Sequence, residues 1–98
     1  MEYIKKRIER IEDELESAEE YAELYLESKA RGQSARASKY YEMSHDELKH
    51  AENIYELAEQ DIESLRKVFP ISVEDEECWS MAKKRMHERI ARIRMYYQ

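Results

Sequence analysis

Two segments of the chain pair a glutamate with a histidine three residues later, a spacing that suits metal binding from one face of a helix. They are Glu-Met-Ser-His at 42–45 and Glu-Leu-Lys-His at 47–50. A carboxylate and an imidazole spaced in this way can ligate one ion together, and the carboxylate can bridge to a second. The chain contains 19 glutamates, so the tetrapeptide alone carries little information. The surface on which each pair lies decides its meaning.

The neighbours of the two pairs differ in polarity. Around Glu42 and His45 the residues one helical turn away are mostly polar, and we interpret that pair as part of a solvated face. Glu47 and His50 instead share one helical row with apolar side chains, namely Met43, Ile54 and Leu57. Ionisable groups in an apolar stripe need a partner or a metal ion. This row predicts a metal site at Glu47 and His50, with an interior polar contact between helices as the open alternative.

Two long helices must position these residues. Apolar or small residues recur at alternating steps of four and three through about 2–30 and about 34–69, as expected for amphipathic helices. The first stripe is Ile4, Ile8, Ile11, Leu15, Ala18, Ala22 and Tyr25, and the second is Ala37, Tyr41, Ser44, Leu48, Ala51, Tyr55, Ala58, Ile62, Leu65 and Phe69. Gly32 can adopt the left-handed conformation that ends the first helix, and Ser34 can cap the N-terminus of the second. The second helix is expected to end before Pro70. The short link predicts that residues 1–70 form an antiparallel helical hairpin.

The sequence of residues 71–98 predicts a third, C-terminal helix, which Ser72 can cap. This helix is acidic at first and becomes basic, an order that suits the helix dipole. Its apolar face is Trp79, Ala82, Met86, Ile90, Ile93 and Tyr97. We expect this helix to serve packing or assembly. The fold class is therefore all-α, a hairpin plus a third helix. A single hairpin cannot cover these long apolar stripes on both sides. We therefore expect a homodimer or higher homo-oligomer in which two half-bundles complete a four-helix bundle.

The hairpin geometry also places another acidic residue, Glu14, close to Glu47. It borders the first apolar stripe and stands 18 residues before Gly32, whereas Glu47 stands 15 residues after it. At about 1.5 Å rise per residue, the two carboxylates fall within about one helical turn of each other. Nearby glutamates are competitors that we interpret as a solvated face, namely Glu16, Glu19 and Glu20.

Composition and charge argue against several functions. With 98 residues the chain forms one domain at most. Residues 1–70 hold 11 Lys/Arg against 18 Asp/Glu, and residues 71–98 hold 6 against 5, so nucleic-acid binding is disfavoured. The single cysteine, Cys78, cannot form an intrachain disulfide or a zinc or iron–sulfur cage. No apolar run reaches the ~20 residues of a membrane span and the N-terminus lacks a signal-peptide core, so we expect a cytoplasmic protein without a membrane partner.

From Glu14 to Ala51 the sequence resembles the first helical hairpin of rubrerythrins, which belong to the ferritin-like superfamily. The likeness rests on Glu14, Tyr21, Ser28-Lys29-Ala30 followed by Gly32, and Asp46-Glu47-Leu48-Lys49-His50-Ala51. The resemblance implies that Glu14 is a terminal ligand, Glu47 a bridging ligand and His50 the imidazole ligand, with Tyr21 as a phenol behind them. It implies a di-iron centre, with manganese or zinc as other ions, and assigns no separate catalytic residue.

The chain departs from rubrerythrins in having no second hairpin and no cysteine-rich rubredoxin module. A two-metal centre would therefore form between two chains, as in short encapsulin-associated ferritins, and peroxidase activity of the rubrerythrin type is not expected. The first hypothesis is a ferritin-like protein of iron oxidation, storage or oxidative-stress protection, whose enzymatic activity, if any, is ferroxidase-like. The alternative is a non-catalytic structural or assembly protein, for example phage-associated, that keeps the hairpin without a metal.

Overall fold

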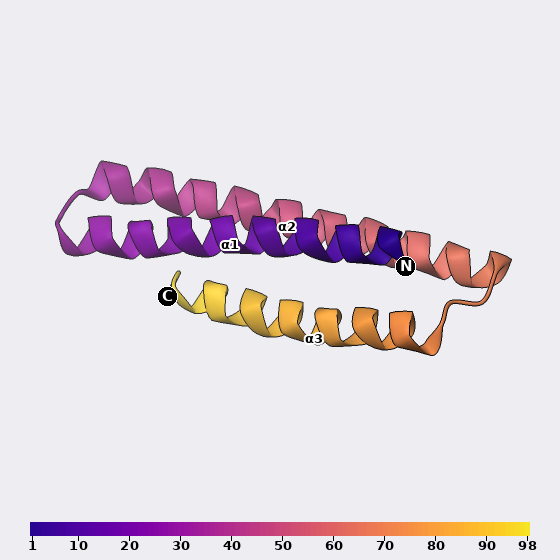
Figure 1. The fold of residues 1–98 in the computed structure, drawn as a ribbon. Coiled ribbons are helices and arrows are strands. Elements are labelled where there is room, and N and C mark those ends of the chain that lie inside the picture. The colour runs from indigo at the N-terminus through magenta and orange to yellow at the C-terminus, as the bar shows by residue number, and fades with distance from the viewer.

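The computed structural model describes residues 1–98 as three helices without strands: α1 (Glu2–Ala30), α2 (Ser34–Val68) and α3 (Val73–Met95). Figure 1 shows α1 and α2 lying antiparallel as a hairpin, with α3 returning along its length. The molecule is a rod of 55 × 19 × 17 Å. The prediction of an all-helical chain is confirmed. No helix has the length and apolar character needed to cross a membrane.

The turn between α1 and α2 consists of Arg31, Gly32 and Gln33. Gly32 has φ 72, the left-handed conformation that a side chain disfavours, so glycine suits this position. The Gln33 amide donates to the Ser28 carbonyl at 2.9 Å, and the Gln33 carbonyl accepts from the Ala37 amide at 2.9 Å. The second bond makes Gln33 the N-cap, so the prediction that Ser34 caps α2 is wrong. Ser34 already lies in the first helical turn.

The core follows the two predicted stripes closely except at their ends. Six of the α1 positions and six of the α2 positions are buried: Ile4, Ile8, Ile11, Leu15, Ala18, Ala22, Ala37, Ser44, Leu48, Ala51, Ala58 and Ile62. Tyr41 and Phe69, expected in the same stripe, are 38% and 42% exposed. Phe69 is exposed because α2, with 35 residues, extends beyond α1, with 29, as Figure 1 shows near the N-terminus.

α3 packs on one face of the hairpin. Its buried side chains are Trp79, Ala82, Met86 and Ile93, as the apolar pattern predicts. Trp79 donates a hydrogen bond from Nε1 to Glu59 Oε1 at 2.6 Å and stacks on Tyr55 at 5.9 Å between ring centroids. The third helix therefore acts as a packing arm on its own hairpin.

Ser72 caps α3 as predicted, because its Oγ accepts a hydrogen bond from the Asp75 amide at 3.1 Å. We expect Ser72→Ala to lower the free energy of unfolding by about 1 kcal/mol, measured by urea denaturation followed by circular dichroism. Ser80→Ala is the matched control, since Ser80 is exposed inside the same helix and alanine favours helix there. Equal stabilities for the two variants would contradict the capping role.

Candidate metal centre

Glu14 of α1 and the Glu47–His50 pair of α2 meet on the face of the hairpin opposite α3. Glu12 on α1 and Glu52 on α2 form ion pairs with α3. Glu14 and His50 each lie two residues from these, about 200° around the helix, so both point away from α3. His50 Nδ1 lies 3.8 Å from Glu14 Oε2 and 3.9 Å from Glu47 Oε2. One ligand atom from each of the three residues can be chosen so that all lie within 4.8 Å of one another.

The three side chains differ in their exposure to water. The side chains of Glu14 and Glu47 are 13% and 27% exposed, whereas His50 is 58% exposed. The expectation that His50 lies inside an apolar stripe is therefore wrong. Its row continues to Ile54, half-buried, and Leu57, which is 60% exposed, because no helix of the chain covers this face.

A positively charged side chain, Arg10, lies beside the cluster. Arg10 Nη2 forms an ion pair with Glu14 Oε1 at 3.2 Å, one turn along the same helix. Arg10, Glu14, His50, Asn53 and Ile54 line a shallow depression of about 310 Å³. The second oxygen of Glu14 faces His50 and remains available to an ion, so Arg10 orients the Glu14 carboxylate without occupying both of its oxygens.

The pKa of the Glu47 carboxyl is shifted by its neighbours in the cluster. A hydrogen bond with Glu14, partial burial and the negative charge of Glu14 raise the pKa of Glu47 above its ordinary value, while His50 and Arg10 oppose the shift. Two carboxylates this close repel each other, and a metal ion between them would neutralise both charges. Metal binding at this site should therefore weaken as the pH falls, because protonation of Glu47 competes with the ion.

We expect Glu47→Gln to stabilise the metal-free protein at neutral pH by about 0.5 kcal/mol, because it removes a like-charge contact. The folded-state pKa of Glu47 is raised, so its ionisation costs stability as the pH rises through that value. The gain should be full at pH 7 and small below the ordinary pKa of 4.5. Urea denaturation at both pH values measures it. The exposed Glu42→Gln is the control, and an equal gain there would contradict the coupling.

Tyr21 lies apart from the three candidate ligands. It is seven residues from Glu14 on the same helix, about 10 Å along the axis, and its ring stacks on Tyr40 of α2 at 6.4 Å between centroids. No hydrogen bond joins its hydroxyl to Glu14, Glu47 or His50. The structure therefore places Tyr21 on the same face of the hairpin, in an aromatic contact of its own.

Of the competing glutamates, Glu16 and Glu20 are exposed, as expected for a solvated face. Glu19 differs, since its side chain is only 14% exposed and lies against α3. Burial alone would raise the pKa of Glu19, but hydrogen bonds from three side chains lower it overall: Arg92, Tyr96 and Arg89. Glu19 is thus a docking residue for α3, and its partners lie about 70 residues away in the sequence, where no local pattern indicates them.

The other Glu-x-x-His pair has a role that the sequence did not indicate. The His45 ring stacks on Tyr97 at 4.0 Å and lies against Tyr41 at 4.4 Å between centroids. The Tyr97 hydroxyl is 2.7 Å from Ser44 Oγ, which donates to the Ala18 carbonyl at 2.6 Å. His45 is exposed, as expected, but it anchors the end of α3. The place of Tyr97 in the apolar pattern predicted for residues 71–98 was the only signal for this contact.

The site thus offers two carboxylates and one imidazole from two helices, a set of oxygen and nitrogen ligands that binds iron, manganese or zinc. Comparison of the chain with protein-family models, curated proteins and solved structures gives no match. The likeness to the rubrerythrin hairpin therefore rests on the residues quoted above.

Proposed function

We propose that this protein binds a divalent transition-metal ion, iron in the first place, through Glu14, Glu47 and His50. The observation that carries the proposal is the convergence of these three ligand atoms within 4.8 Å from two different helices. The raised pKa of Glu47 supports it, because the shift reflects the closeness of Glu14, and a cation between the two carboxylates would neutralise both. Manganese and zinc suit the same ligands.

The proposal includes a second copy of the chain on the open face of the hairpin. Three protein ligands leave coordination positions of the ion free. A second chain related by a two-fold axis would bring an equivalent Glu14, Glu47 and His50, and the two sets together could hold a two-metal centre. Arg7, one heptad before Glu14 on this face, has a buried Nε without a hydrogen-bond partner. The face also carries half-buried or exposed apolar side chains at the matching heptad positions: Tyr3, Tyr21, Tyr40, Met43, Ile54, Leu57 and Leu65.

In this proposal the site holds iron for oxidation or storage in the cytoplasm. The second candidate is a structural or assembly protein in which the same residues form a polar network without a metal. The Arg10–Glu14 ion pair favours this candidate, since it supplies Glu14 with a partner already. The exposure of His50 at 58% favours it as well, because an exposed imidazole needs no ligand to satisfy it.

Native mass spectrometry of protein loaded with Fe²⁺ without oxygen separates the two candidates. We expect the mass of two chains with two bound ions, and a loss of both ions in Glu47→Gln and His50→Ala. Glu42→Gln, which alters the other Glu-x-x-His pair, should keep the metal. Failure of the unaltered protein to retain iron, manganese or zinc would reject metal binding, and a metal-free dimer would then support the structural candidate.

A further inference from the structure

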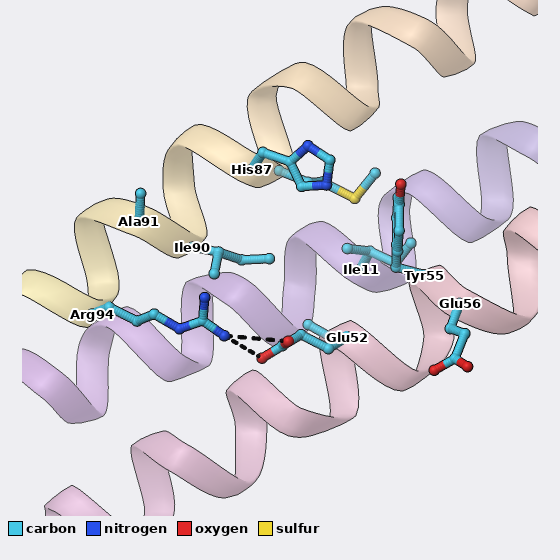
Figure 2. Close-up of a pocket in the computed structure, with 10 residues that line it drawn as sticks. Ile11, Glu52, Tyr55, Glu56, His87, Ile90, Ala91 and Arg94 are labelled. Atoms are coloured by element: carbon cyan, nitrogen blue, oxygen red, sulfur yellow. Dashed lines mark hydrogen bonds and ion pairs between the residues drawn. The ribbon is translucent and has the colours of Figure 1, made fainter.

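A cavity of about 480 Å³ lies between α2 and α3, on the opposite side of the hairpin from Glu14, Glu47 and His50. Its apolar lining includes Ile11, Ala51, Tyr55, Met86, Ile90 and Ala91, drawn in Figure 2. Two contacts join the C-terminal segment to α2 on either side of the cavity. Trp79 stacks on Tyr55 toward one end, and the Tyr97 hydroxyl is hydrogen-bonded to Ser44 toward the other. Between these bridges Ala51 is too small to fill the gap, and the slot remains.

The floor and one end of the slot suit a flat ring. Ile11, Ala51 and Met86 are buried core residues that make the floor of the slot apolar, with a polarisable thioether among them. Tyr55 and His87 close one end with their rings at 5.6 Å between centroids, 63° apart. Aromatic groups of this kind bind another ring by stacking or by edge contacts. Burial, and then the charge of Glu59, raise the pKa of Tyr55, so its hydroxyl stays a hydrogen-bond donor at neutral pH.

Arg94 and Glu52, at the mouth of the slot, already neutralise each other. Arg94 Nη2 donates to both carboxylate oxygens of Glu52, at 3.2 and 3.3 Å. Figure 2 shows this pair side by side at one end of the slot, and the carboxylate of Glu56 directed away from it. A charged ligand would lose hydration without gaining a free counter-charge, which is unfavourable. The lining therefore directs no free charge into the slot.

We propose that this slot is a binding site for a small, neutral, aromatic molecule, held between α2 and α3 with Tyr55 as its hydrogen-bond donor. The volume of about 480 Å³ lies within the ~300–1,000 Å³ typical of small-molecule sites, which are mostly apolar with a few polar groups that fix orientation. The site goes beyond the proposed metal function and does not depend on it.

The neutral fluorophore N-phenyl-1-naphthylamine tests the site by titration, together with the methyl NMR signals of the lining residues. We expect saturable binding at one site, with shifts at the methyl groups of Ile11, Met86 and Ile90. Ile90→Phe should weaken binding at least tenfold, because the half-buried Ile90 borders the slot and a larger ring fills it. Ile71→Phe is the matched control, since Ile71 is also half-buried against the core but lies outside the slot, and should bind as before.

Three results would overturn this site. They are no saturation up to the solubility limit of the probe, unaltered binding to a folded Ile90→Phe protein, or methyl shifts at Leu65 and Val68 instead. Those two residues line a separate apolar depression at the end of α2. The methyl shifts are read on the unaltered protein, so they decide the question even where Ile90→Phe fails to fold.

Discussion

Zn²⁺ at a hundredfold excess over its dissociation constant is expected to raise the unfolding temperature by about 10–20 °C. An ion that binds only the folded chain at this excess stabilises it by about 2.7 kcal/mol, and each kcal/mol corresponds to about 4–8 °C for a domain of this size. Zinc is chosen because it accepts carboxylate and imidazole ligands and has no redox chemistry. Thermal unfolding followed by circular dichroism measures the shift.

Three variants locate the effect of the ion. Glu47→Gln and His50→Ala should abolish most of the stabilisation by zinc, whereas Glu42→Gln should keep it. The stabilisation should also shrink from pH 7 to pH 5, since the raised pKa of Glu47 makes a proton compete with the ion. The same rise in unfolding temperature in all three variants would place the ion elsewhere on this acidic surface.

Replacement of Trp79 should have the largest effect on the fold itself. We expect Trp79→Ala to lower the free energy of unfolding by about 3–5 kcal/mol, as for other buried aromatic residues. Trp79 is 1% exposed and supplies both the stacking contact with Tyr55 and the hydrogen bond to Glu59. Small domains have total stabilities of about 5–15 kcal/mol, so the loss should be plain in urea denaturation.

Two further variants separate the two contributions of Trp79. Trp79→Phe keeps a ring in the core but removes the indole donor, and it should cost clearly less than Trp79→Ala. Glu59→Ala leaves the buried indole Nε1 without its acceptor and should cost about 1–3 kcal/mol. A loss below about 1 kcal/mol for Trp79→Ala would show that α3 is held mainly by its other contacts.

The hairpin could be predicted from the sequence because its determinants are local. The spacing of apolar residues gave the buried faces of both long helices, and Gly32 gave the turn, whose φ of 72 few other residues adopt. Once the turn was fixed, counting residues on each side was enough to bring Glu14 next to Glu47 and His50. Ligand proximity of this kind follows from helix geometry alone.

The environment of the site could not be predicted in the same way, because it depends on where α3 packs. α3 covers the Glu12 and Glu19 side of α1, which buries Glu19 and leaves His50 exposed on the other face. Ser34 illustrates a smaller limit. A serine one residue downstream of the observed N-cap has the right chemistry but the wrong place, because the Gln33 carbonyl makes the first helical bond.

The ion pairs along α3 have a consequence for how the helix finds its place. They run from Glu76 with Arg66 to Arg94 with Glu52, and include Lys83 with Glu59, Arg85 with Glu12, and Arg89 and Arg92 with Glu19. Most of these side chains are partly exposed to water, so that a single pair contributes little energy, although Glu19 is only 14% exposed. Sliding α3 by one turn, about 5.4 Å, would break all of them together. The ion pairs thus act together with the buried contacts of Trp79 to favour a single alignment of α3 on the hairpin.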